Sequence, residues 1–192
     1  MILTNIIKES FQEYEGHISL VLFSFGCNLR CKECYNLKDV LDPNKIIGEA
    51  QHIIGANLTP LHDAVVFLGG EPTVWADLPD VLDFVKSKDL KTKIYTNGLN
   101  PDLIKTINEK KLVDAYSVDF KTLNNPGVLG IDISLKQYFI QVNSTLQNII
   151  RHNISLEIRT TRWTGVDVEQ IQEFLSRYYP QIKHIIQDKF VI

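Results

Sequence analysis

The feature that most constrains this chain is a group of three cysteines, Cys27, Cys31 and Cys34, within one stretch of eight residues. The number is odd and the spacing is too tight for a disulfide framework, so metal binding or redox chemistry explains the group better. Three thiolates can hold three irons of a cubane and leave the fourth open, whereas an electron-transfer cluster generally uses four cysteines. A closed zinc site needs a fourth ligand. The spacing therefore favours an iron–sulfur cluster with an open iron, with zinc or unpaired buried thiols as weaker alternatives.

The composition is that of a globular domain without a nucleic-acid or membrane partner. The chain has 192 residues, 44% of them hydrophobic, which suffices for one sizeable core, so we expect a single domain over residues 1–192. The net charge is -3, and basic residues are scattered among acidic ones. The first residues show no export signal, and the apolar stretch 18–25 is too short to span a bilayer. We therefore expect a cytoplasmic protein.

Short β-rich apolar runs alternate with amphipathic stretches along the chain. This alternation predicts parallel strands joined by crossover helices. The expected strands are Ile18–Phe25, Ala64–Leu68, Lys93–Tyr95, Ala115–Asp119, Ser155–Arg159 and Ile182–Ile186. Because these six units fall short of the eight in a closed barrel, we expect an α/β fold of the open, partial (β/α)6 barrel type.

Helix starts are marked at Asp42–Pro43 and Asn100–Pro101, where a capping residue precedes a proline. Apolar residues recur at helical spacing near 82–85 and 103–112, and longer helices are expected near 136–152 and 167–179. The segment Thr122–Ser134 is rich in Asn and Gly. We expect it to be a surface loop that can contact a substrate.

Residues suited to ligand binding follow several of the expected strands, and the carboxyl ends of parallel strands converge on one crevice. Gly69 and Gly70 let a ligand approach the backbone closely, and Glu71 adds a carboxylate. A tight turn with a solvated glutamate is the simpler alternative for this block. Thr96 and Asn97 end the next strand, where a plain turn is the alternative to a ligand site.

Charged residues end the next two strands. Asp119 and Lys121 are two residues apart, so their side chains point to the same face, where a simple ion pair is the alternative to a ligand site. The planar fork of Arg159 suits bidentate pairing with a carboxylate, and Glu157 is an equally suitable partner. The far wall of the crevice is expected to consist of Gln187, Asp188 and Lys189. The aromatic residues expected to serve mainly in packing are Trp75, Trp163, Tyr178 and Tyr179.

The cysteine spacing is the signature of the radical S-adenosylmethionine (SAM) superfamily, and further blocks narrow the resemblance. These blocks are Tyr14-Glu15-Gly16, Phe23-Ser24-Phe25-Gly26-Cys27, Cys34-Tyr35-Asn36, Gly69-Gly70-Glu71-Pro72-Thr73, Tyr95-Thr96-Asn97-Gly98, Ser117-Val118-Asp119-Phe120-Lys121 and Glu157-Ile158-Arg159-Thr160-Thr161. Together they resemble the anaerobic ribonucleoside-triphosphate reductase activating proteins, which are relatives of the pyruvate formate-lyase activating enzyme. The resemblance runs from about Tyr14 to Phe190.

The resemblance implies a [4Fe-4S] cluster on the three cysteines and SAM chelated to its open iron. It implies that Glu71 meets the α-amino group of SAM and that Lys121 meets the SAM carboxylate. Asp119 would help to orient the SAM site through a bound monovalent cation. Arg159 would serve the same carboxylate or a substrate group. The remaining residues implied in SAM binding are Gly69, Gly70, Thr96 and Asn97.

The resemblance also implies a reaction and its partners. An electron from a flavodoxin- or ferredoxin-like protein would reach SAM, which would split into methionine and a 5′-deoxyadenosyl radical. The radical would take a hydrogen from a glycine Cα in a glycyl radical enzyme, most simply an anaerobic ribonucleotide reductase. Two alternatives stay open. One is radical SAM chemistry on a small molecule or peptide, and the other is a non-enzymatic metal or electron-transfer module held by the cysteines.

The chain departs from the resemblance at three positions beside the expected site. Glu33 stands before the third cysteine, where many radical SAM enzymes carry an aromatic residue near the adenine. Tyr35 follows that cysteine, where relatives commonly have His. Tyr95 precedes Thr96 in place of an Asp, which removes a carboxylate suited to a cation. The last change puts the cation site in doubt, and leaves the cluster unaffected.

Overall fold

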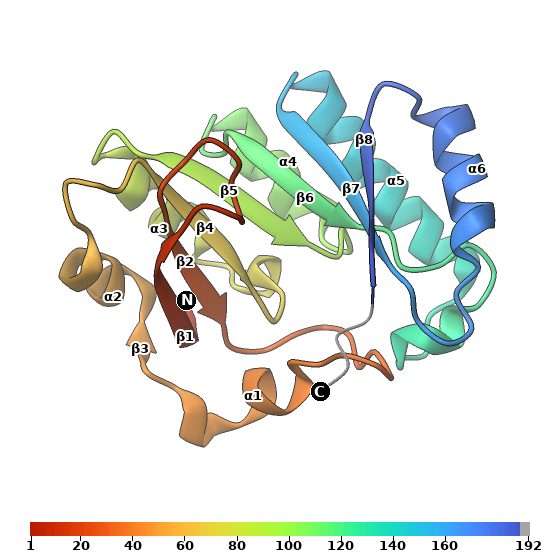
Figure 1. Cartoon of the computed structure of the whole chain (residues 1–192), viewed down its shortest axis with the longest axis horizontal. Helices are drawn as coiled ribbons and strands as arrows, with labels where there is room; N and C mark the ends of the chain where they lie inside the picture. The colour runs from red at the N-terminus through yellow and green to blue at the C-terminus, as the bar shows by residue number, and fades with distance from the viewer. Residues whose placement is uncertain (189–192) are drawn as a thin grey trace.

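A single twisted sheet organises the molecule, and the computed structural model describes residues 1–188. Its eight strands lie in the order β3-β1-β2-β4-β5-β6-β7-β8 (Figure 1). They are β1 (Ile2–Ser10), β2 (Ser19–Ser24), β3 (Gly48–Glu49), β4 (Ala64–Gly69), β5 (Lys91–Thr96), β6 (Ala115–Asp119), β7 (Ser155–Thr161) and β8 (Lys183–Gln187). The strands from β2 to β8 along this order pair in parallel, and β1 pairs antiparallel with both β2 and β3.

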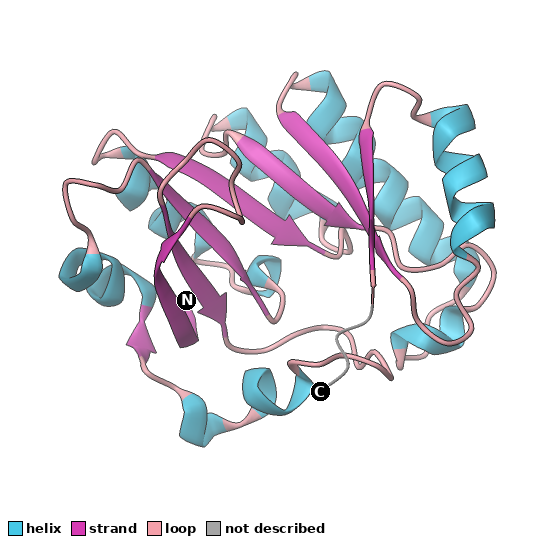
Figure 2. Cartoon of the chain, viewed as in Figure 1, coloured by secondary structure: helices cyan, strands magenta, loops and turns pink. Residues whose placement is uncertain are grey.

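Helices cover one face of the sheet and leave the other face open (Figure 2). The α-helices of the described residues are α1 (Leu37–Leu41), α2 (Ala50–Asn57), α3 (Leu78–Lys86), α4 (Pro101–Glu109), α5 (Leu135–Arg151) and α6 (Val168–Tyr178). Three short 3-10 helices lie at Pro43–Lys45, Pro72–Val74 and Pro126–Leu129. Within the described residues β8 pairs with β7 alone and β3 with β1 alone, so the sheet does not close into a barrel. The expected open α/β fold is therefore confirmed.

The core lies between the sheet and the helices that cover it. Val65 and Phe67 of β4 and Ile94 of β5 are fully buried on the covered face. Ile104 of α4 and Val142 of α5 are buried against them in the same core cluster. Each such side chain contributes about 1.5–3 kcal/mol by leaving water, so the periodicity of these segments decides which face each element turns to the core.

The six parallel strands expected from the sequence are all present, with ends that differ by at most two residues. The antiparallel β1 and β3 were not expected. β1 mixes buried Leu3 with exposed polar positions, because its far edge is covered only by the two residues of β3. The pattern of alternation is therefore weak, and tertiary pairing decides the strand.

The helix expected to start at Asp42–Pro43 is present only as a single 3-10 turn. Asp42 does cap the backbone, since its side chain accepts a hydrogen bond from Asn44 N at 2.9 Å, but only the 3-10 turn Pro43–Lys45 follows. Ile47 N then donates to Leu3 O at 2.9 Å, and the chain enters β3 before α2 begins at Ala50. Pairing with β1 therefore replaces the helix. By contrast, Asn100 caps α4 as expected.

The segment Thr122–Ser134 was expected to be a surface loop, and this is wrong for its centre. Val128 and Leu129 are buried, and their carbonyls accept hydrogen bonds from Lys32 N and Arg30 N. Gly130 has φ +67°, and a Cβ there would lie 1.8 Å from Arg30 O. The segment is therefore a support for the cysteine loop, and glycine is required for that close contact.

No helix among the described residues is both long and apolar enough to cross a membrane.

Candidate functional site

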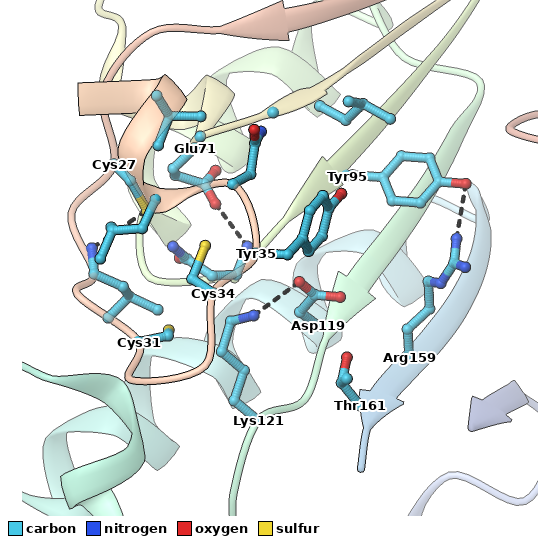
Figure 3. Close-up of a pocket in the computed structure, with 18 of the residues that line it drawn as sticks. Cys27, Cys31, Cys34, Tyr35, Glu71, Tyr95, Asp119, Lys121, Arg159 and Thr161 are labelled. Carbon is cyan, nitrogen blue, oxygen red and sulfur yellow. Dashed lines mark hydrogen bonds and ion pairs between the residues drawn. The ribbon is translucent and has the colours of Figure 1, made fainter. Parts of the chain in front are cut away.

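The carboxyl ends of the parallel strands surround a cavity of about 260 Å³ on the open face of the sheet. The structure brings every residue predicted for the site into the lining of this cavity (Figure 3). These residues are Cys27, Cys31, Cys34, Gly69, Gly70, Glu71, Thr96, Asn97, Asp119, Lys121 and Arg159. The expected far wall is also present at Gln187 and Asp188, whereas Lys189 lies outside the described residues.

The three cysteines lie on the loop between β2 and α1, and this loop is held from several sides. The Arg30 guanidinium donates to Cys27 O and to Leu29 O, each at 2.7 Å. Leu29 N donates to Cys27 Sγ at 3.4 Å. Arg30 N donates to Leu129 O at 3.0 Å. The backbone around the thiols is therefore fixed by the loop itself and by the segment before α5.

The thiols suit an iron–sulfur cluster as a donor set. All three are free cysteines that face one cavity. Among residues 1–188, no three His, Cys, Asp or Glu side chains converge closely enough to hold one metal ion. The ligands of a cubane bind separate irons and need not converge on one point, so the arrangement fits. Burial raises the pKa of the Cys27 thiol to about 11 and raises that of Cys31, so binding iron must release protons.

Gly70 brings the end of β4 against the cysteine loop. Its N–H donates to Ser24 O at 3.0 Å, and Glu71 N donates to Gly26 O at 2.9 Å. A Cβ at Gly70 would lie 1.9 Å from Gly26 O. Only glycine permits this approach, so the glycine pair sets the distance between the two loops as well as the access of a ligand to the backbone.

The Glu71 carboxylate is buried and accepts four hydrogen bonds from protein donors. Oε1 accepts from Thr73 N at 3.1 Å, Thr73 Oγ1 at 2.6 Å and Thr96 Oγ1 at 2.8 Å, and Oε2 accepts from Asn97 N at 2.7 Å. The residue is 1% exposed. Burial raises the pKa of Glu71, although these hydrogen bonds favour its charged form. The simpler alternative of a solvated glutamate is therefore wrong, and the carboxylate ties the end of β4 to the end of β5.

Lys121 and Asp119 form the ion pair that the sequence left open as an alternative. Lys121 Nζ lies 2.9 Å from Asp119 Oδ2 (Figure 3). Burial alone would lower the pKa of Lys121, but the neighbouring Asp119 carboxylate raises it above its usual value, so the cation persists. Because both residues also line the cavity, the pair places one positive and one negative group beside the cysteines.

Arg159 is held by Tyr95 at the floor of the cavity. Its Nη1 donates to Tyr95 Oη at 2.9 Å, while Tyr95 Oη donates to Glu13 O at 2.9 Å. Glu157, the partner considered from the sequence, lies 3.9 Å away and binds Lys93 more closely, at 3.1 Å. Burial raises the pKa of Tyr95 far above its usual value, so it stays neutral. Tyr95 therefore supplies a neutral acceptor for the guanidinium.

Several residues in or beside the pocket were given no binding role from the sequence. Asn28 accepts a hydrogen bond from Asn97 Nδ2 at 2.7 Å. Tyr35 projects into the cavity, and its side chain is largely exposed (Figure 3). Trp163 lines the cavity as well as packing against the core, so the expectation of a packing residue is incomplete. Aromatic residues just after a strand end were the available signal for Trp163, whereas nothing in the local pattern marks Asn28.

Comparison with known sequences decides the family. Residues 21–177, which are most of the chain, match the family model of the Radical SAM superfamily. This chain belongs to the radical SAM superfamily. Membership implies a [4Fe-4S] cluster and SAM, and the cysteine loop with its adjoining cavity is the part of this radical SAM protein that fits them.

Two curated relatives come from Methanocaldococcus jannaschii. The first is provisionally named glycyl-radical enzyme activating enzyme MJ1227. This chain is 34% identical to it over 122 residues, a match that covers 62% of this chain and 50% of the relative. It is 26% identical over 173 residues to another with the same provisional name, MJ1632, covering 85% of this chain and 66% of the relative. The matches thus span half to two thirds of the relatives' lengths.

Solved structures share the fold. The structure named native anSMEcpe with bound AdoMet and Kp18Cys peptide has a TM-score of 0.62 and 15% identity, and covers 90% of this chain and 51% of that chain. The structure of TYW1 with a lysine-pyruvate adduct has a TM-score of 0.61 and 17% identity, and covers 91% of this chain and 65% of that chain. At such low identity these likenesses establish the fold alone.

Proposed function

We propose that this protein is a radical SAM activase that generates a glycyl radical on a partner enzyme. When bound, a [4Fe-4S] cluster supplies the electron that splits SAM into methionine and a 5′-deoxyadenosyl radical. The observation that carries the proposal is the cavity itself, in which three cysteines on one loop adjoin the polar ends of four neighbouring strands. A simple electron carrier would need no such cavity.

In this proposal the chain's own residues bind and orient SAM. Cys27, Cys31 and Cys34 hold the cluster. Lys121, fixed by Asp119 at 2.9 Å, meets the SAM carboxylate as a charge-assisted donor. Arg159 serves the same carboxylate or a substrate group.

The backbone at Gly69 and Gly70 accepts the α-amino group of SAM. Both oxygens of Glu71 already accept protein hydrogen bonds, so this carboxylate supports the group by holding the ends of β4 and β5 together. Thr96 and Asn97, which Glu71 holds in this way, form the wall next to the SAM amino acid moiety.

The monovalent cation that the resemblance implies beside Asp119 is not part of the proposal. Tyr95 stands in the position of the second carboxylate, and its hydroxyl is engaged by Arg159. We therefore propose that Arg159 and Lys121 supply the positive charge of this region and that catalysis is independent of added K⁺ or Na⁺.

The partner is proposed to be an anaerobic ribonucleotide reductase, with a flavodoxin- or ferredoxin-like electron donor. The provisional names of the two archaeal relatives support a glycyl radical enzyme as the partner class. The open face of the sheet supports a protein substrate, because a loop can enter beside β8, which pairs with β7 alone among the described residues.

The test is an anaerobic mixture of reconstituted protein, SAM, a chemical reductant and a candidate anaerobic ribonucleotide reductase, followed by electron paramagnetic resonance. A glycyl radical doublet that requires SAM and is lost in Cys31→Ala is expected. Deoxyadenosine that forms without the doublet would redirect the proposal to a small molecule or peptide. The absence of both deoxyadenosine and SAM binding in a cluster-loaded protein would refute it.

A further inference from the structure

Arg30 lies between the first two cysteines, and its side chain folds back onto the loop that carries them. Its Nη1 donates to Cys27 O and to Leu29 O, each at 2.7 Å. One nitrogen therefore holds two carbonyl groups of the same turn. The Leu29 side chain is 2% exposed and belongs to the core cluster, so the turn is also held from the protein interior.

The same turn aims a backbone donor at the sulfur of Cys27. Leu29 N donates to Cys27 Sγ at 3.4 Å. The thiol also faces Asn28 Oδ1 at 4.0 Å, but that contact needs the thiol proton, which leaves when the sulfur binds iron. A hydrogen bond from an N–H becomes stronger when its acceptor is negatively charged. The Leu29 contact is therefore suited to persist when the cysteine is a thiolate ligand.

The backbone of Arg30 is fixed independently of its side chain. Arg30 N donates to Leu129 O at 3.0 Å. The segment before α5 comes so close that a Cβ at Gly130 would lie 1.8 Å from Arg30 O. Replacing the Arg30 side chain should therefore leave the loop attached to the rest of the protein and release only the turn that the guanidinium holds.

Arg30 can act on a cluster through its charge or through its hydrogen bonds. The residue is exposed, and the field of an exposed charge is screened by water and salt. The two hydrogen bonds act within the loop, so screening affects them less. Lys32 is equally exposed on the same loop, and its side chain makes no hydrogen bond or ion pair within residues 1–188. Lys32 therefore allows the charge to be tested separately from the hydrogen bonds.

We propose that Arg30 is a positioning residue that holds the Leu29 N–H on the Cys27 sulfur and thereby raises the reduction potential of the cluster. The inference rests on the proposed function, in which the three cysteines hold a [4Fe-4S] cluster. Reduction adds one electron to the 2+ state to give the 1+ state, so negative charge on the sulfurs increases. Hydrogen bonds to the sulfurs help to set the potential, because they stabilise the reduced state more than the oxidised state.

The test is an anaerobic redox titration of the reconstituted protein without SAM or a partner enzyme. A low-potential chemical reductant and mediators set the potential, and electron paramagnetic resonance quantifies the reduced cluster. In Arg30→Met the ratio of reduced to oxidised cluster at a fixed potential should fall about three- to tenfold. For a one-electron couple this is a downward shift of about 30–60 mV. Arg30→Lys keeps a cationic donor beside the two carbonyls and should recover most of the shift.

Lys32→Met is the matched control, because it removes an equal charge from the same loop without removing a side-chain hydrogen bond. Its potential should equal that of the wild type. A shift in Lys32→Met as large as that in Arg30→Met would assign the effect to charge and overturn the positioning role. An unchanged potential in Arg30→Met, with iron and sulfide analysis showing a complete cluster, would overturn the inference as well.

A backbone variant removes the donor directly and decides the question if Arg30→Met does not retain the cluster. Replacing Leu29 with its α-hydroxy analogue by nonsense suppression turns the N–H into an ester oxygen and leaves Arg30 in place. The potential should fall by about as much as expected for Arg30→Met. The same analogue at Leu61, an exposed leucine outside the cavity lining, should leave the potential unchanged. A wild-type potential in the Leu29 variant would overturn the role of this N–H.

The outcome for the wild type separates this inference from the proposed function. A wild-type protein that takes up no [4Fe-4S] cluster would refute the proposed function. A wild-type protein that holds the cluster and cleaves SAM, with a potential that is insensitive to the changes at Leu29 and Arg30, would keep the proposed function and overturn only the inference.

Discussion

Asn97 Nδ2 donates a hydrogen bond to Asn28 Oδ1 over 2.7 Å, which joins the end of β5 to the loop that carries the cysteines. Asn97 is 4% exposed, and its own N–H donates to Glu71 Oε2 at 2.7 Å. Glu71 in turn holds Thr73 and Thr96. One continuous set of hydrogen bonds therefore connects the strand ends to the cysteine loop. Residues that hold the loop in this way should influence ligand binding measurably.

Replacing Asn28 with Ala should loosen the cysteine loop without removing a ligand. The loss of this partly buried hydrogen bond corresponds to about 1 kcal/mol, so SAM affinity should fall about fivefold while iron content stays complete. Equilibrium dialysis and iron analysis of the reconstituted variant measure the two quantities. Asn44→Ala is the control, because Asn44 is exposed in the turn after α1 and lies outside the cavity lining. Full SAM affinity in Asn28→Ala would show that the Asn97 contact does not orient the loop.

Glu71→Gln should lower stability as well as ligand binding. The amide nitrogen of Gln would face N–H and O–H donors that now approach the carboxylate, which leaves at least one buried donor unsatisfied at a cost of about 1–3 kcal/mol. In a chain of this length that is a fall of about 3–10 °C in Tm. Circular dichroism melting of the cluster-free protein measures it. Glu109→Gln, an exposed i,i+4 partner of Lys105, should melt within about 1 °C of the wild type. A Glu71→Gln protein as stable as that control would contradict the prediction, because it would mean that the donors around residue 71 rearrange and find other partners.

The strand ends were predictable because parallel strands bring distant sequence blocks to one edge. Gly69, Asp119 and Arg159 each follow an apolar run, and the geometry of the sheet alone then places them around one cavity. The contacts that orient the site were not predictable in this way. Thr164 meets Glu33 across 131 positions of sequence, and neither residue lies in a repeating pattern. Such pairs depend on how two loops fold, which local periodicity does not encode.

The ion pairs around Arg159 were also only partly predictable from the sequence. The strand pattern predicted that Arg159 would reach a ligand or Glu157, but the side chain of Lys93 also enters this region and takes the shorter contact to Glu157. The sequence pattern predicted Lys93 only as the first residue of a strand. A buried lysine among apolar residues signals a partner, and the identity of that partner follows only from the register of β5, β6 and β7.

The two single substitutions that break the Lys93–Glu157 ion pair should lower the unfolding free energy by different amounts. Burial lowers the pKa of Lys93, and Glu157 is its near partner at 3.1 Å. Glu157→Leu leaves Lys93 buried without that carboxylate, so it should cost about 3 kcal/mol of unfolding free energy. Lys93→Met leaves Glu157 with Arg159 at 3.9 Å and should cost less. The double variant should recover most of the loss, because it removes both charges together. Urea unfolding of all four proteins measures the cycle, and equal single losses would contradict the asymmetry.

Asp114 should make the fold sensitive to acid at the pole opposite the cavity. Burial raises the pKa of Asp114, but hydrogen bonds from Lys86 at 2.8 Å, Thr92 N at 2.8 Å and Lys91 at 3.2 Å outweigh burial and hold the pKa below its usual value. The native state therefore binds fewer protons here than the unfolded chain does, and its stability rises with pH in this range.

The contribution of Asp114 should be complete above its unfolded pKa of about 3.9 and disappear as pH falls through the lower folded pKa. The unfolding free energy of the wild type, measured with urea from about pH 6 to pH 3, should therefore fall with a steeper slope than that of Asp114→Asn. The variant should already be less stable at neutral pH, since the amide cannot replace the charge that faces the two lysines. Asp132→Asn, at an exposed position, should follow the wild type throughout. Parallel curves for wild type and Asp114→Asn would locate the acid sensitivity in other carboxylates, because the two proteins differ only in whether this position can take up a proton.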